Sequence, residues 1–154
     1  MEELNLPTYD VRTRINPTTT NREIWDTQRR RWVRLTPEEW VRQHFVHFLI
    51  EHMDYPSGRI GNEIAIKVGQ TERRCDSVVF GDEGNPVMIV EYKAPTVQLS
   101  QQTFDQISRY NMALQVEWLM VSNGLQHFCC RLNPETKCWE FLRGLPAYQD
   151  LTHP

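Results

Sequence analysis

The sequence lacks the features that mark membrane and secreted proteins. None of its apolar runs approaches the roughly 20 residues needed to span a bilayer, and the first 30 residues contain no apolar signal-peptide region. Internal repeats and low-complexity segments are also absent. At 154 residues the chain is long enough to bury the core of one domain. We therefore expect a single-domain cytoplasmic protein with no membrane partner.

Cysteine is scarce, and its spacing does not indicate a metal or disulfide framework. The chain has four cysteines and no C-x-x-C pair, so neither a zinc ribbon nor a set of disulfides is predicted. Cys129 and Cys130 lie close to His127 and could in principle bind a metal. The surrounding FCCR segment is typical of an apolar strand, however, where small buried cysteines are common. We expect free thiols.

What the sequence does contain is a hairpin pattern with acidic residues near its open end. The segment Arg74–Phe80 ends in an apolar run, Gly81–Pro86 is dense in turn-forming residues, and Val87–Val90 is continuously apolar. If the turn is centred between positions 83 and 84, the numbers of paired residues sum to 167. Asp76 then lies directly opposite Glu91.

Two opposed carboxylates indicate a cation between them. Directly opposed side chains on one face have Cβ atoms about 4.5–5.5 Å apart, so unpaired carboxylates there would repel each other. Lys93 projects to the same side as Glu91 because strand side chains alternate. Oxygen ligands with room for water and a phosphate oxygen suit Mg²⁺, and a nearby lysine can orient water or stabilise charge on phosphate. The implied reaction is phosphodiester hydrolysis.

The simpler interpretation is that Asp76 and Glu91 are ordinary polar residues at strand ends, with Lys93 paired to one of them. Acid-x-Lys triplets are common by chance. The apolar strand before Glu91 weighs against this interpretation, because isolated charges at the end of a buried strand are costly to desolvate.

An Asp, a hairpin and then Glu-x-Lys at the end of an apolar strand resemble the PD-(D/E)xK nuclease superfamily. Cys75 stands where the superfamily's name has Pro. VEYKAP, the segment Leu99–Leu114 and the segment Trp118–Arg131 resemble, more specifically, the N-terminal nuclease domain of type I restriction enzyme R subunits. The resemblance covers roughly residues 35–145. It implies a restriction-endonuclease-like α/β fold, a mixed sheet flanked by helices, and a DNA endonuclease that uses Mg²⁺, for which Mn²⁺ can substitute.

The same family has a Gln-x-x-x-Tyr motif after the lysine, which Gln106 and Tyr110 match. Residues four apart share one face of a helix, and a helix from Ser100 as N-cap to about Leu114 is predicted here. The resemblance implies that Gln106 and Tyr110 point toward the site. Without it, a solvated glutamine beside a half-buried tyrosine is an equal alternative.

The helix predicted before the hairpin offers a third acidic candidate for the site. Thr36 is the predicted N-cap and Pro37 the first helical residue, and Glu39 would complete a capping box. The resemblance implies that an acidic residue on this helix assists metal binding, so Glu39 is a candidate for catalysis and for the metal as well as for capping. Glu38 is the reserve choice, and Glu63 is a third.

The net charge of −3 is unusual for a protein that grips nucleic acid, since phosphate contacts supply most non-specific affinity. Arg29–Arg31 beside Trp32 form one basic stripe, which we interpret as a solvated edge. Arg73 and Arg74 lie nearer the predicted site and are the better phosphate contacts.

We expect three regions: an N-terminal arm with a candidate hairpin packed on the core (1–35), the nuclease core (36–145) and an irregular tail (146–154). The expected order, by residue number, is hairpin 24–35, helix 37–53, strands 60–68, 74–80 and 87–93, helix 100–114, strands 118–122 and 125–132, and an edge strand 139–142.

Two functions follow. The first is a metal-dependent DNA endonuclease domain in restriction or defence, with Asp76, Glu91 and Lys93 at its centre. The second is a non-catalytic DNA-binding or protein-docking module that retains the nuclease fold. The chain has no G-x-x-x-x-G-K-[ST] phosphate loop, so a separate motor or restriction-complex subunit is an expected partner. Cutting both strands would also favour a homodimer on DNA.

Overall fold

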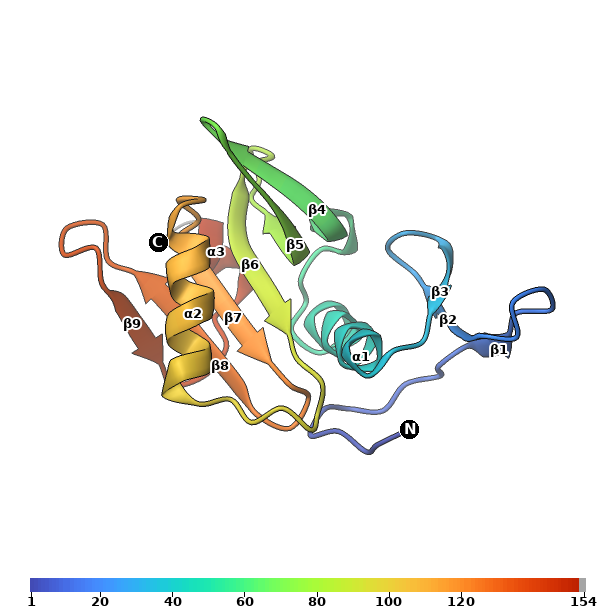
Figure 1. Cartoon of the computed structure of the whole chain (residues 1–154). Coiled ribbons are helices and arrows are strands. Elements are labelled where there is room, and N and C mark those ends of the chain that lie inside the picture. Colours follow the sequence, from blue (N-terminus) through green and yellow to red (C-terminus); the bar gives the residue numbers. More distant parts are fainter. Residues whose placement is uncertain (153–154) are drawn as a thin grey trace.

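The computed structural model describes residues 1–152, and its main body is a six-stranded mixed sheet (Figure 1). The strands follow each other across the sheet in chain order. Only β6 and β7 are parallel neighbours within the described residues, while the other pairs are antiparallel. The strands are β4 (Ile60–Val68), β5 (Thr71–Phe80), β6 (Pro86–Tyr92), β7 (Trp118–Ser122), β8 (His127–Leu132) and β9 (Trp139–Leu142).

Helices cover both faces of this sheet. Helix α1 (Pro37–Glu51) and the short α3 (Tyr148–Thr152) pack on one face, where Phe45 and Leu151 join the same core cluster as Met88. Helix α2 (Gln101–Met112) covers the other face through a second cluster. A single 3-10 turn, η1 (Ser57–Arg59), leads into β4. This mixed α/β sheet flanked by helices confirms the predicted restriction-endonuclease-like fold.

The helices begin where the sequence predicts. Thr36 accepts a hydrogen bond from the Glu39 N–H (3.1 Å), and Ser100 accepts one from the Thr103 N–H (3.2 Å). Each cap satisfies a backbone donor that the first helical turn leaves unpaired. No helix among residues 1–152 has both the length and the apolar character to cross a membrane.

The predicted hairpin register is confirmed in the β5–β6 ladder. Ser77 pairs with Val90 and Val79 with Met88, and the numbers in both pairs sum to 167. The register shifts between Val79 and Phe80, so the irregularity lies next to the turn and not at the open end. Asp76 and Glu91 are therefore the next opposed positions beyond the last paired residues.

The N-terminal segment forms a second, smaller sheet. Strands β1 (Thr13–Ile15), β2 (Arg22–Asp26) and β3 (Arg31–Arg34) are antiparallel, in that order. The predicted hairpin is thus β2–β3, and the N-terminal arm contributes a third strand, β1, that was not predicted. In Figure 1 this sheet lies beyond α1, away from α2 and β9. The first residues run back to the main sheet, where the Asn5 N–H donates to the Gly124 carbonyl (2.8 Å).

The prediction of an irregular tail is wrong for residues 148–152, which form α3. Tyr148 and Leu151 are buried, and the Tyr148 hydroxyl donates to the Phe80 carbonyl (3.0 Å). A five-residue helix has too few turns to show an apolar period, so tertiary packing decides its conformation. The expected tail positions 153 and 154 lie outside the described residues.

Burial predicts a large difference between two phenylalanines that receive the same substitution. Phe45 is fully buried between α1 and the sheet, whereas Phe141 on β9 is 52% exposed. Phe45→Ala should lower the free energy of unfolding by about 3–5 kcal/mol, while Phe141→Ala should cost about 1 kcal/mol or less. Urea denaturation measures both, and equal losses would contradict the assigned core.

Candidate functional site

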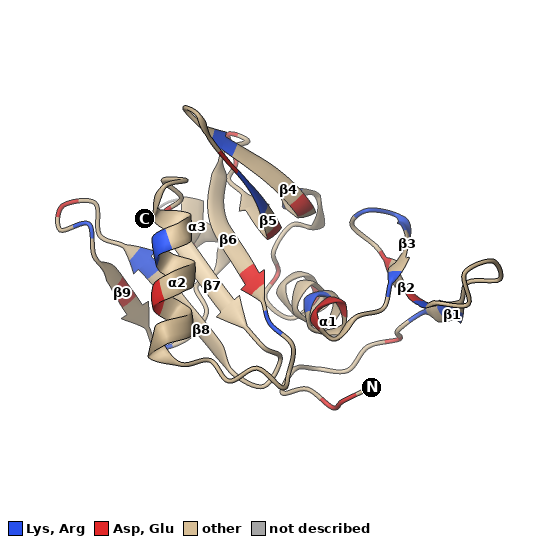
Figure 2. Ribbon diagram, viewed as in Figure 1, with Lys and Arg blue, Asp and Glu red and all other residues tan. Residues whose placement is uncertain are grey.

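Three carboxylates stand in a row across β4, β5 and β6, at the end of the sheet that faces α1. The pairs Asn62–Ser77 and Ile64–Cys75 bracket Glu63 and Asp76, which makes these two opposed, as Asp76 and Glu91 are on the next strand. Figure 2 shows acidic segments on β4, β5, β6 and the start of α1 around this place. The arrangement extends the predicted pair by one residue.

A cavity of about 350 Å³, here called the carboxylate hollow, contains this row. Its walls come from β4, β5, β6, α1 and Thr36, the residue just before α1. Lys93, the residue after β6, also lines it. The full lining is Thr36, Glu38, Glu39, Arg42, Glu63, Asp76, Glu91, Tyr92 and Lys93. Asp76, Glu91, Lys93 and Glu39 of the predicted site are therefore brought together in one cavity.

Asp76 and Glu91 lie close enough for each to change the pKa of the other. Burial raises the pKa of Glu91 to about 8, with the negative charge of Asp76 and a hydrogen bond to it adding to the effect and Lys93 opposing it. Burial also raises the pKa of Asp76, against the Tyr92 N–H, which donates to Asp76 Oδ2 (2.9 Å), and the charge of Arg42. Two carboxyl groups this close hold a proton between them when no cation is present.

Glu39 lies in the same hollow, but its carboxylate is already fully engaged. Oε1 accepts hydrogen bonds from Arg29 (2.8 Å) and Arg42 (2.6 Å), and Oε2 accepts from Arg42 (2.8 Å) and Gln43 (2.9 Å). Burial opposes ionisation, yet the bonds and charge of Arg42, with Gln43 and Arg29, lower the pKa of Glu39. Its side chain therefore serves to hold the arginines, in place of reaching back to the N-cap.

Arg42 connects the elements that surround the hollow. Besides its bonds to Glu39, its Nη1 donates to Glu63 Oε1 (2.7 Å) and to the Asp76 carbonyl (2.8 Å). The side chain is 9% exposed, so these partners replace water around a buried cation. One guanidinium thus fixes α1 against β4 and β5 at the point where Asp76 stands.

Glu63 adopts a left-handed backbone conformation, with φ of 57°. Such a conformation is uncommon for a residue with a side chain and is concentrated at functional sites. On a regular strand, residues 62 and 64 would share a face. Here Asn62 bonds to Ser77 beneath α1, whereas Ile64 packs in the cluster under α2. The strained residue lets the β4–β5 hairpin change faces beside Asp76.

A chain of buried hydrogen bonds begins at Tyr92, on the β6 wall of the carboxylate hollow. The Tyr92 hydroxyl donates to Ser77 Oγ (2.9 Å), Ser77 donates to Asn62 Oδ1 (2.7 Å), and Asn62 Nδ2 donates to Asp26 Oδ2 (3.0 Å). Asp26 in turn receives Arg29, whose other arm binds Glu39. The chain joins β6, β5 and β4 to the small N-terminal sheet, so both sheets hold the site.

A second cavity of about 300 Å³ adjoins the first on the α2 side and shares Glu91 and Lys93 with it. Gln106 and Tyr110 line this helix-side hollow, together with Arg74, Ile107 and Asn111. Tyr110 is 47% exposed, and the Arg73 guanidinium lies 4.0 Å from its ring centroid. The predicted glutamine and tyrosine thus line a cavity that also contains Glu91 and Lys93.

The oxygen ligands available here suit a hard divalent cation that keeps part of its water shell, rather than a metal enclosed entirely by protein side chains. Among residues 1–152, no group of three or more His, Cys, Asp or Glu side chains is arranged to hold a metal. Mg²⁺ commonly takes one or two carboxylates and completes its shell with water and substrate phosphates. Asp76 and Glu91 supply such a pair, and the cation would replace the proton that they share. Glu39 does not add a free carboxylate oxygen.

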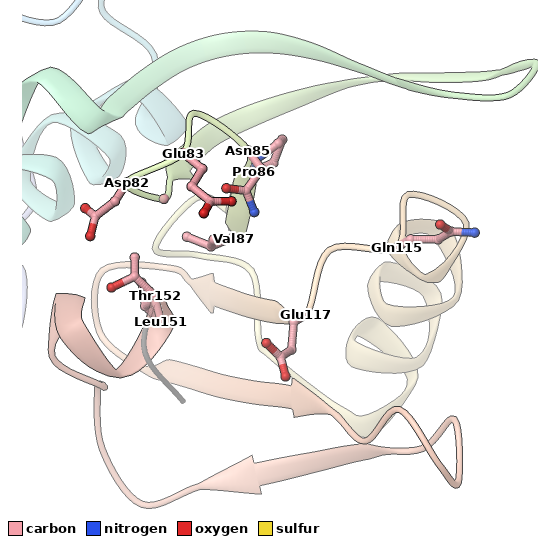
Figure 3. Close-up of a pocket in the computed structure, with 10 residues that line it drawn as sticks. Asp82, Glu83, Asn85, Pro86, Val87, Gln115, Glu117, Leu151 and Thr152 are labelled. Carbon is pink, nitrogen blue, oxygen red and sulfur yellow. The ribbon is translucent and has the colours of Figure 1, made fainter.

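The sheet also has a cavity at its other end, of about 440 Å³ (Figure 3). Asp82, Glu83 and Asn85 of the β5–β6 turn line it, with Glu117 before β7 and Thr152 of α3. Its charged lining is entirely acidic within the described residues, which would repel a phosphate group. We therefore assign the candidate site to the end where Lys93 and Arg74 accompany the carboxylates.

Sequence reasoning missed Arg42 and the contact that it makes with Glu63. The signal for Arg42 was available, because it follows Glu39 by three residues on a helix and can pair with it. The backbone conformation of Glu63 has no such signal, since Gly, Asn and Asp are the residues that favour it.

The sheet order, the flanking helices and the row of carboxylates define a domain of restriction-endonuclease-like architecture. Residues 37–146 match the family model described as type I restriction enzyme R protein N terminus, which covers most of the chain. The chain belongs to this family, and membership supports a restriction-related role. A comparison with curated proteins finds no match.

Removing the buried guanidinium should destabilise the domain. Arg42→Met keeps an apolar stem of similar length but leaves part of Glu39 and the Asp76 carbonyl without their donor. We expect a loss of about 3–5 kcal/mol in the free energy of unfolding. Arg109→Met, at an exposed position of α2, should change it by about 0.5 kcal/mol or less. A loss below about 1 kcal/mol for Arg42→Met in urea denaturation would refute this role.

The raised pKa of Glu91 makes the metal-free protein less stable at higher pH. The folded pKa of about 8 exceeds the ordinary value of 4.5, so the folded state binds this proton more tightly than the unfolded state does. The contribution is full below about pH 4.5 and is lost as the pH rises through about 8. Denaturation in a chelator between pH 5 and pH 9 should show this decline, and Glu91→Gln should flatten it. Parallel profiles would count against the coupled pair.

Proposed function

We propose that this domain is a Mg²⁺-dependent DNA endonuclease that hydrolyses phosphodiester bonds within a restriction system. The observation that carries the proposal is the pair of partly buried carboxyl groups, Asp76 and Glu91, which lie opposite each other in a cavity that Lys93 also lines. A structural ion pair would place a cation against each acid. Here the two acids face each other, at a cost in desolvation that a bound divalent cation would offset.

Asp76 and Glu91 would hold the metal, and Mn²⁺ would be accepted in its place. When bound, the ion would lower the pKa of water and stabilise negative charge on phosphate. The Lys93 ammonium, at the edge of both hollows, would donate hydrogen bonds to the attacking water or to a phosphate oxygen. Its charge also favours ionised Glu91, and hence the state that binds a cation.

Residues on the helix side would position the substrate. Gln106 and Tyr110 line the hollow next to Lys93, so an amide and a phenol can orient the ammonium or a phosphate. Arg74 lines the same hollow and is 65% exposed, which leaves its guanidinium available to DNA. Glu39 and Glu63 would act through Arg42 by holding the position of Asp76.

Membership of a restriction enzyme R family supports action within a restriction complex. DNA, a separate motor subunit and a second copy of the domain remain the proposed partners. Cleavage of both strands by single-site domains would need two copies.

A nicking assay with matched acidic variants tests the function. Wild type with Mg²⁺ or Mn²⁺ should nick supercoiled plasmid, and chelation should stop it. Glu91→Gln and Lys93→Ala should lower the rate at least about 100-fold, because the first removes a proposed metal ligand and the second removes the cation proposed to contact the attacking water or the phosphate. Glu83→Gln makes the same change as Glu91→Gln in the cavity at the other end of the sheet, and should keep the wild-type rate.

Calorimetry with Mg²⁺ and Mn²⁺ separates the remaining outcomes. Metal binding that Asp76→Ala abolishes, without cleavage of any DNA, would mean that the chemistry depends on a partner subunit. A wild type that neither binds metal nor cuts DNA would overturn the proposal in favour of a non-catalytic docking or DNA-binding module.

A further inference from the structure

The positive charge of this chain is concentrated in one short segment. Residues 11–36 contain seven arginines and two acidic residues, a net charge of +5. Because the whole chain carries −3, the remainder carries −8. The segment forms the β1–β3 sheet and its connections, and it precedes the residues matched by the family model.

The register of the small sheet sorts its side chains onto two faces. Glu23 and Trp25 alternate with Ile24 and Asp26 along β2, so the two pairs point to opposite sides. Ile24 and Asp26 are fully buried and therefore face the body of the protein. Glu23 and Trp25 mark the outer face.

Three arginines gather on that outer face around two tryptophans. Arg14 and Arg34 pair with Glu23, and Trp32 pairs with Trp25. Arg12 lies across from Trp25, and the backbone N–H of Trp25 donates to the Arg12 carbonyl (2.9 Å). The guanidinium carbons of Arg12 and Arg14 lie 5.0 Å from the Trp25 ring centroid and 4.7 Å from that of Trp32, respectively. The rings hold these cations at the surface. Arg14 also pairs with Glu23 on this face, where its Nε donates to Glu23 Oε1 (2.8 Å), so the three arginines and Glu23 leave the face with a net charge of +2.

We propose that the outer face of the β1–β3 sheet, with the β2–β3 turn, binds the DNA backbone beside the carboxylate hollow. The inference rests on the proposed nuclease function. All seven cations of the segment are arginine, the side chain whose planar fork matches phosphate oxygens. The acidic remainder of the chain repels DNA elsewhere, so this face supplies a localised grip.

The sheet is also fixed relative to the site. Gln28 in the β2–β3 turn donates to the carbonyls of Ser57 (2.8 Å) and Ile60 (2.9 Å), and Arg29 of the same turn binds Glu39, which lines the hollow. Figure 2 shows basic segments in this turn and in the sheet, on the side of α1 away from α2. DNA held there is presented to Asp76 and Glu91 without a flexible linker.

Binding measured without metal tests the inference separately from catalysis. Fluorescence anisotropy of labelled duplex and single-stranded DNA would be recorded with the full chain in chelator, across a range of salt concentrations. The outer-face variant changes Arg12, Arg14 and Arg34 to Gln. We expect its dissociation constant to rise at least about ten-fold near 0.1 M salt, and the slope of log K against log salt to become shallower by about 2–3.

A charge-matched control and a second variant keep the result interpretable. Changing Arg109, Lys137 and Arg143 to Gln removes the same charge from exposed positions on α2, in the β8–β9 connection and after β9, and should alter affinity by no more than about two-fold. If loss of the arginine–tryptophan contacts unfolds the outer-face variant, Arg30→Gln with Arg31→Gln and Arg34→Gln removes three exposed charges from β3 and its turn.

Equal losses in the control and the outer-face variant would reduce the effect to total charge and overturn the inference, as would wild-type affinity in folded variants. The latter outcome would assign the face to an acidic protein partner. A protein that binds DNA through this face but cuts nothing would instead refute the nuclease function while leaving the surface intact.

Discussion

The Arg42 guanidinium is the constraint on which this site depends. A buried cation is tolerated only when its donors find partners, and Arg42 finds them on three different elements: Glu39 on α1, Glu63 on β4 and the Asp76 carbonyl on β5. Satisfying one side chain therefore closes α1 onto the β4–β5 hairpin. The carboxylate hollow lies beside this contact between α1 and the hairpin, so its shape depends on how the Arg42 charge is paired.

The row of Glu63, Asp76 and Glu91 lowers the stability of the fold, and contacts elsewhere must offset this loss. Asp76 and Glu91 share a partly desolvated site, and Glu63 holds a left-handed conformation next to them. Each feature works against folding, and each lies where the proposed chemistry would occur. Two core clusters on either side of the sheet supply the opposing stability. Local violations of this kind, confined to one site in an otherwise regular domain, are what a functional centre is expected to show.

Local sequence patterns predicted most of the helices, strands and turns, because neighbouring residues decide where these elements form. Strands 60–68, 118–122 and 139–142 match β4, β7 and β9 in full, and a turn of known length fixed the β5–β6 register. The errors arose where distant contacts decide the structure. The third strand β1 exists because β2 offers it an edge, and α3 because Tyr148 and Leu151 reach the core. From the sequence, the side chain of Glu39 could serve a cap, a metal or an arginine. In the structure it binds Arg42 and Arg29, and the contact with Arg29, ten residues earlier, has no local sequence signal.

Net charge is an uninformative property of this sequence, because a sum conceals the distribution of charge. A total of −3 is unusual for a protein that binds nucleic acid, yet +5 resides in residues 11–36 and the acidic excess lies elsewhere. The two regions are coupled through the Arg29–Glu39 contact and the Asn62–Asp26 bond. Attraction and repulsion of phosphate are therefore separated in space and held in fixed relation by buried polar contacts. On the proposed DNA-binding face, such a division would orient a polyanion along the surface, whereas a uniformly basic domain would only concentrate it there.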